Sequence, residues 1–139
     1  MRKVAATLAA LGLAGCAVFG GLRGADPLAG WGGVWTGEYQ GGSGAGPLEF
    51  EFSTDTAGMP VGVARFDTGM GMEQTSLGSP VLTRDSVRCE LSFDGMAVEI
   101  RGARSEEDSA EGVFVVRYQG GEQPIDSGIW TAGRRPAGQ

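Results

Sequence analysis

Apolar and polar residues alternate with a period of two in several segments that follow Trp31. Residues 48–53 read Leu-Glu-Phe-Glu-Phe-Ser, and residues 86–93 place Val, Cys, Leu and Phe on one face and polar side chains on the other. Successive side chains of a β-strand point to opposite faces, so this period indicates strands with one face buried and one face in water. No segment after the first 30 residues shows the 3.6-residue period of an amphipathic helix.

Eight strands are expected from these patterns, in the ranges 34–39, 48–53, 61–67, 81–84, 86–93, 96–101, 112–119 and 125–132. The connections between them are short, and several are rich in glycine. Sequential strands with short connections form antiparallel meanders, and a meander of eight strands can close into a barrel, which removes exposed edges. The sequence therefore predicts an all-β domain over residues 31–135, an up-and-down antiparallel meander that forms a closed or nearly closed barrel.

The dipeptide Asp94-Gly95 stands between two strands with clear alternation. Asp-Gly favours a two-residue hairpin of type I′, because both central positions of that turn need a positive φ. A two-residue turn at this place fixes the register of the two strands and sets Leu91 opposite Val98 on the inner face. A slip of one residue would turn polar side chains inward, which burial forbids.

On the outer face of this hairpin, the same register brings like charges together. Glu90 faces Glu99 and Arg88 faces Arg101, and such pairs are unfavourable. The diagonal neighbours carry opposite charges, so the sequence predicts a crossed group of four in which Glu90 contacts Arg101 and Arg88 contacts Glu99. Exposed ion pairs of this kind contribute about 0–1 kcal/mol each.

A short motif, Gly33-Val34-Trp35, opens the first predicted strand, and two arginines, Arg134 and Arg135, follow the last one. This arrangement resembles lipocalin-like (calycin) barrels, which open with Gly-x-Trp. The resemblance implies that Trp35 plugs the base of the barrel and that an arginine, Arg134, packs on it. The span 31–135 is also similar to small barrel domains of many bacterial lipoproteins. The chain is shorter than true lipocalins and lacks their usual disulfides.

The first 15 residues have the layout of a secretory signal peptide. Two positive residues at positions 2 and 3 precede an uncharged apolar run, 4–13, which is much shorter than the ~20 residues of a membrane-spanning helix. The motif Leu13-Ala14-Gly15-Cys16 is similar to the lipobox of bacterial lipoproteins. That resemblance implies cleavage before Cys16, diacylation of its sulfur and acylation of the new amino group.

The lipoprotein resemblance also implies a location in the cell. Two or more acyl chains hold a protein stably on a bilayer. In Gram-negative lipoproteins an Asp directly after the Cys usually retains the protein in the inner membrane, and Ala17 stands at that position here. The expected location is therefore the periplasmic face of the outer membrane. Residues 16–30 are expected to carry the lipid and form a tether, and residues 136–139 a C-terminal tail.

Composition excludes several classes of function. The chain has no His, and loss of the two positive charges at positions 2 and 3 changes its formal charge from −6 to −8. Such an acidic protein repels phosphate backbones, so a nucleic acid is not an expected partner. Without His, Ser-His-Asp and Cys-His catalysis and His-based zinc sites are excluded. We expect no catalytic site, no cofactor and no metal.

Three groups of residues allow both a structural and a functional interpretation. Cys89 lies on an apolar strand face, where a buried inert thiol competes with a disulfide to another chain. Met70 and Met72 lie in a predicted loop, where they are incidental or bind Cu(I). The acidic stretch 104–110 forms a solvated turn, or a Ca²⁺ ion is held by the carboxylates of Glu106, Glu107, Asp108 and Glu111. The structural interpretation is favoured for all three.

The expected function is that of a membrane-anchored, non-catalytic module of the cell envelope that contacts an envelope protein. The alternative is a carrier of one small apolar ligand, because an eight-stranded barrel either is filled by side chains or holds a small ligand. The inward-facing residues are bulky and favour a filled interior. They are Leu48, Phe50, Phe52, Leu91, Phe93, Met96 and Ile100. A dry cavity above ~300 Å³ would favour the carrier instead.

Overall fold

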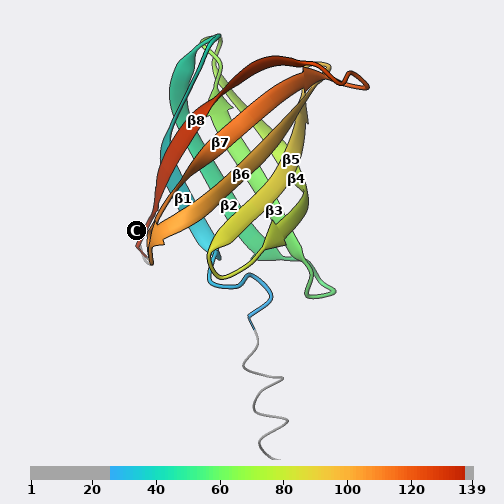
Figure 1. The fold of residues 1–139 in the computed structure, drawn as a ribbon. Coiled ribbons are helices and arrows are strands. Elements are labelled where there is room, and N and C mark those ends of the chain that lie inside the picture. Colours follow the sequence, from blue (N-terminus) through green and yellow to red (C-terminus); the bar gives the residue numbers. More distant parts are fainter. Residues whose placement is uncertain (1–25, 137–139) are drawn as a thin grey trace, which may run out of the picture.

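A computed structural model describes residues 26–136, which form eight strands and no helix (Figure 1). The strands are β1 (Gly33–Gly41), β2 (Ala45–Thr54), β3 (Pro60–Asp67), β4 (Met72–Leu82), β5 (Ser86–Phe93), β6 (Met96–Glu106), β7 (Ser109–Tyr118) and β8 (Pro124–Arg134). No segment within 26–136 is a helix long and apolar enough to cross a membrane. The predicted signal peptide and Cys16 lie outside the described residues.

All eight strands run antiparallel to their neighbours and form one closed barrel. Each strand pairs with the next in sequence, and β8 returns to pair with β1, where Trp35 lies opposite Arg134. Figure 1 shows the strands strongly tilted around a single interior. The predicted all-β, up-and-down antiparallel meander is confirmed, and the barrel is fully closed.

The two ends of the barrel, which we call the base and the mouth, differ in the segments that form them (Figure 1). The base contains the first described residues, 26–32, the C-terminal end of β8, and the connections 55–59, 83–85 and 107–108. The mouth is formed by the connections 42–44, 68–71, 94–95 and 119–123. The chain therefore enters and leaves the barrel at the base, and only connections lie at the mouth.

The hairpin of β5 and β6 has the register that the sequence predicts. Leu91 pairs with Val98 and all neighbouring pairs follow without a shift. Asp94 and Gly95 have φ angles of 53° and 77°, both positive, as a type I′ turn requires. The local signal of the Asp-Gly turn was therefore sufficient to fix this part of the barrel.

The predicted crossed group of four charges on this hairpin is wrong. Glu99 pairs with Arg101 at 2.7 Å on its own strand and with Arg117 of β7 at 3.5 Å. Within residues 26–136, neither Arg88 nor Glu90 forms an ion pair. The hairpin alone could not indicate this, because β7 flanks β6 on its other side and supplies a competing cation.

Strand β4 begins nine residues earlier than its predicted start. Its first half places Glu73 and Thr75 on the same face as the buried Leu77, so polar side chains interrupt the apolar face and hide the alternation. The register then shifts between Gly78 and Val81, where a bulge lies. Such a bulge changes which face each residue occupies, and a period of two cannot be followed across it.

Large side chains fill the half of the barrel near the base. Trp31 and Trp35 are each 1% exposed, and their ring centroids lie 5.0 Å apart. Phe52 approaches Trp31 edge-on at 6.2 Å. Of the seven apolar residues expected to point inward, five are buried, whereas Phe93 and Met96 near the mouth are only half-buried.

Candidate functional site: a plugged base and an apolar cavity

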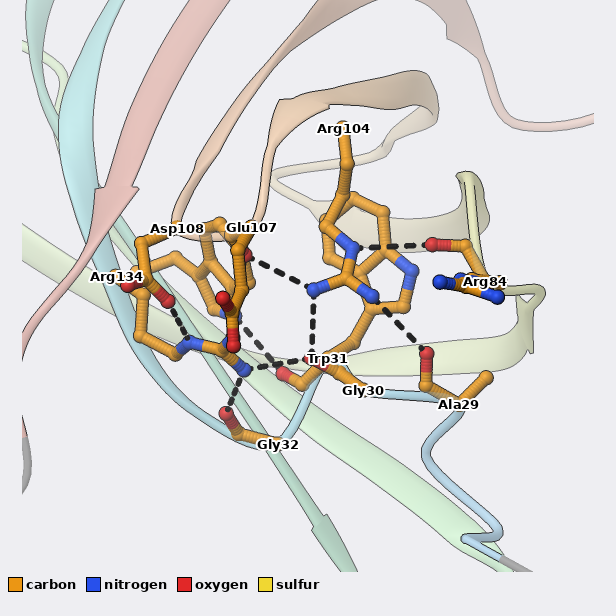
Figure 2. A network of polar contacts seen from close by, with 10 residues as sticks. Ala29, Gly30, Trp31, Gly32, Arg84, Arg104, Glu107, Asp108 and Arg134 are labelled. Carbon is orange, nitrogen blue, oxygen red and sulfur yellow. Dashed lines mark hydrogen bonds and ion pairs between the residues drawn. The ribbon is translucent and has the colours of Figure 1, made fainter.

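Arg134 covers Trp35 at the base. Its guanidinium carbon lies 4.8 Å from the centroid of the Trp35 ring. Arg134 also donates hydrogen bonds to the main-chain carbonyl of Gly30 at 2.6 Å and to the carboxylate of Asp108 at 2.8 Å (Figure 2). The Trp35 indole N–H donates to the carbonyl of Trp31 at 2.8 Å. The structure thus brings together the two residues that the calycin resemblance assigns to the plug.

A second tryptophan–arginine pair, which the sequence analysis missed, lies beside the first. The guanidinium carbon of Arg104 is 5.6 Å from the centroid of the Trp31 ring. Arg104 donates to the carbonyls of Gly30 at 3.1 Å and Glu107 at 2.9 Å (Figure 2). A signal for this role was present, because Arg104 stands two residues after the inward-facing Gly102 and therefore shares its face.

Within the stretch 104–110, predicted as a solvated turn, Glu107 and Asp108 form an exposed turn at the base, whereas residues 104–106 belong to β6 and 109–110 to β7. The main-chain carbonyl of Glu107 accepts hydrogen bonds from both Arg104 and Arg134, and Asp108 pairs with Arg134. The described part of the chain contains no group of three His, Cys, Asp or Glu side chains placed to hold a metal ion. The Glu107 carbonyl and the Asp108 carboxylate therefore help to fix the arginines that cover the tryptophans.

A cavity of about 320 Å³ occupies the mouth half of the barrel. Six of its lining residues are aromatic, namely Tyr39, Phe50, Phe66, Phe93, Phe114 and Trp130. Aliphatic side chains such as Leu91, Val98 and Ile100 complete the wall. The expectation of an interior filled throughout therefore holds only for the half near the base.

The orientation of Trp130 helps to leave this space open. Its indole N–H lies 3.2 Å from the carbonyl of Arg101 and 3.3 Å from that of Val113, so the side chain reaches across β7 to β6. A Cβ atom added to Gly102 would lie 2.3 Å from the Trp130 ring, which shows how closely the ring approaches the wall. Phe50 packs edge-on against Trp130 at 5.2 Å. These two rings form the inner end of the cavity.

Asp126 and Tyr39 provide polar groups at the outer end of the cavity. The Asp126 carboxylate accepts hydrogen bonds from the main-chain N–H groups of Gly42, Ser43 and Ser127 at 2.9, 3.2 and 2.8 Å. Burial raises the pKa of Asp126, but these hydrogen bonds outweigh burial and hold the pKa below its ordinary value. Asp126 therefore stays ionised at neutral pH. The Tyr39 hydroxyl donates to a main-chain carbonyl at the end of β3.

The sulfur-containing residues singled out from the sequence lie in separate parts of the barrel. Cys89 is 1% exposed with a free thiol, and burial raises the pKa of that thiol to about 12. The predicted burial of Cys89 is confirmed, and its low reactivity stays a prediction. Met70 and Met72 are exposed at the mouth, whereas Met59 lies in a connection at the base. Met59 is therefore separated from Met70 and Met72 by the length of the barrel.

No protein-family model and no curated protein sequence matches this chain. The class of the molecule is therefore defined by its own geometry. It is a closed, eight-stranded, up-and-down antiparallel barrel with a plugged base and an apolar, aromatic-lined cavity at the mouth.

Proposed function

We propose that this protein is a lipid-anchored lipoprotein of the bacterial cell envelope whose barrel binds one small apolar ligand without catalysis. The cavity at the mouth is the observation that carries the proposal. Its volume of about 320 Å³ exceeds the ~300 Å³ at which a ligand site becomes the better interpretation of a barrel interior. Its wall is mainly apolar and aromatic, as is typical of small-molecule sites.

The anchor part of the proposal is supported by the lipobox ending at Cys16 and by the position of Asp26. Asp26 accepts a hydrogen bond from the Gly30 N–H, and Gly30 accepts one from Arg134 at the base, so the chain joins the barrel at the end opposite the cavity. The roughly ten residues between them span at most about 36 Å. In this arrangement the base lies near the membrane, and the mouth is available to ligands of the periplasm.

A second function is contact with an envelope protein. Exposed apolar side chains on the outer wall of the barrel favour it. Val113 of β7 and Ile129 of β8 form a directly opposed pair and are 48% and 56% exposed. Adjacent exposed apolar side chains on a barrel wall are common features of interaction surfaces. A folded protein that binds no ligand in the experiment described below would favour this function over the carrier.

The anchor is tested by Cys16→Ser. We expect this variant to lose incorporation of labelled palmitate, to accumulate as precursor and to leave the detergent phase on phase separation. Cys89→Ala is the matched control, because it removes the other cysteine and should leave acylation unchanged. Ala17→Asp should shift the acylated protein from the outer to the inner membrane of a Gram-negative host. Normal membrane partitioning of Cys16→Ser would overturn the anchor.

The cavity is tested with the neutral apolar probe N-phenyl-1-naphthylamine and the acylated protein in phosphatidylcholine vesicles. Trp130 lines the cavity, so energy transfer from tryptophan to the probe reports binding to the barrel, and a pair of variants locates the binding in the cavity. Val116→Phe fills the cavity from β7, whereas Val115→Phe adds the same atoms to the outer face of that strand. We expect Val116→Phe to weaken the transfer at least fivefold and Val115→Phe to preserve it. Equal signals from both folded variants would overturn the carrier function.

A further inference from the structure

The cavity contains one charge, and that charge is negative. Among the described residues that line the cavity, Asp126 alone is ionised at neutral pH, and no arginine contributes to the wall. A ligand carboxylate or phosphate would enter without a cationic partner and would meet the Asp126 carboxylate. Burial of an unpaired charge is costly, so this wall disfavours anionic ligands such as fatty acids.

Aromatic rings surround the outer end of the cavity near this carboxylate. Tyr39 and Phe114 pack edge-to-face with their centroids 5.9 Å apart, and both line the cavity. A Cβ atom added to Gly41 would lie 2.8 Å from the tip of the Phe114 ring and 3.2 Å from an Asp126 carboxylate oxygen. The ring and the carboxylate therefore border the same point. Aromatic faces beside a carboxylate are the surroundings that an organic ammonium group prefers.

The charges at the mouth have the same sign. The connections 42–44, 68–71, 94–95 and 119–123 include Asp94 and Glu122 but no Arg or Lys. Arg117 lies near the mouth end of β7, but it pairs with Glu99 and donates to the Glu122 carbonyl. A cleft bordered by charges of one sign attracts ligands of the opposite sign.

From these three observations we propose that the barrel selects a small organic cation with an apolar body, bound with its ammonium group between Asp126, Tyr39 and Phe114. The apolar body would lie deeper in the cavity, against Phe50 and Trp130. This inference rests on the proposed ligand-binding function and adds the chemical class of the ligand.

The test compares three octyl compounds that differ only in the head group, as competitors of N-phenyl-1-naphthylamine on the acylated protein in phosphatidylcholine vesicles. The compounds are octyltrimethylammonium, 1-octanol and octane-1-sulfonate. We expect the ammonium compound to compete at a concentration at least tenfold below that of the sulfonate, with octanol between them. Raising the salt concentration should reduce this preference, because exposed charges are screened.

Asp126→Asn identifies the residue responsible. This variant should reduce the preference for ammonium over octanol to less than threefold. The preference is the ratio of the two competing concentrations on the same protein, so a general loosening of the mouth affects both concentrations and cancels in the ratio. Glu111→Gln changes the net charge equally on the outer wall near the base and should keep the wild-type preference. Equal competition by all three octyl compounds would overturn the inference and leave the carrier function standing. Failure of the probe itself to bind would overturn the carrier function first.

Discussion

Gly112 illustrates how closely the strands of this barrel approach one another. It lies on the inner face of β7, and an added Cβ atom would be 1.9 Å from the Arg101 carbonyl oxygen of β6. This neighbour is backbone that is held in the sheet, so it cannot move aside without breaking strand pairing. A side chain at this position is therefore excluded by sterics.

Gly112→Ala should lower the free energy of unfolding by about 3 kcal/mol, at the upper end of the usual cost of overpacking. Urea unfolding followed by circular dichroism measures this change. Gly44→Ala is the matched control, because a Cβ atom at Gly44 meets no atom within 4 Å and should cost much less. Similar losses from both variants would contradict the close approach of β6 and β7.

Trp35→Ala should lower the free energy of unfolding by about 3–5 kcal/mol, because it empties a large buried aromatic site. The change also removes the ring on which Arg134 lies. The same urea experiment checks the value. A loss below about 1 kcal/mol would contradict the role of Trp35 as the plug of the base.

Asp126 connects two elements that are distant in sequence, since its carboxylate on β8 holds the β1–β2 connection. Its folded pKa lies below the ordinary value, so its contribution to stability is fully present above the unfolded pKa of about 3.9. That contribution is lost as the pH falls from there through the folded pKa. The carboxylate should therefore stabilise the mouth at neutral pH and lose this effect in strong acid.

Asp126→Asn should consequently be less stable than the wild type at pH 7, and the difference should shrink as the pH falls below the unfolded pKa of about 3.9. Urea unfolding at several pH values measures both curves. Glu111→Gln, on the exposed outer face, should differ little from the wild type at neutral or acidic pH. A difference between Asp126→Asn and wild type that persists unchanged in acid would show that the ionised carboxylate is not what holds the connection.

Elements with a strong local signal could be predicted from the sequence, and those that depend on distant partners could not. The Asp94-Gly95 turn and clear alternation were enough for β5, β6 and their register. The first half of β4 was missed because Glu73 and Thr75 face inward. The crossed charge group failed because Arg117 comes from a strand that the hairpin does not contain.

The same limit applies to the site. The motif at Trp35 and the position of Arg134 predicted one half of the plug through a resemblance. Trp31 and Arg104 were missed, because Arg104 was grouped with the acidic residues that follow it. The cavity could not be predicted either, since it depends on Trp130 lying across two other strands. Bulky inward residues alone suggested a filled interior.

At the scale of the whole molecule, alkylation of the buried Cys89 thiol measures how often the barrel opens. It is 1% exposed with a pKa raised to about 12, and acylation of Cys16 would leave it the one free thiol of the mature chain. Iodoacetamide at pH 8 should therefore leave the folded protein unmodified and alkylate Cys89 fully in denaturing urea, as mass spectrometry measures. Destabilising variants such as Gly112→Ala should increase the rate in buffer. Rapid alkylation of the folded wild type would contradict the closed barrel.

The pairing of β1 with β8 has a consequence for the lipid-anchored state proposed above. Anchored proteins are confined to two dimensions, where they collide far more often than at the same number in solution. An open sheet in that situation would offer two free edges to its neighbours, and edges are sites of aggregation by strand addition. The seven paired positions from Trp35–Arg134 to Gly41–Gly128 occupy both edges within one chain. With the proposed lipid anchor, copies of this protein would therefore crowd on a bilayer without adding strands to one another.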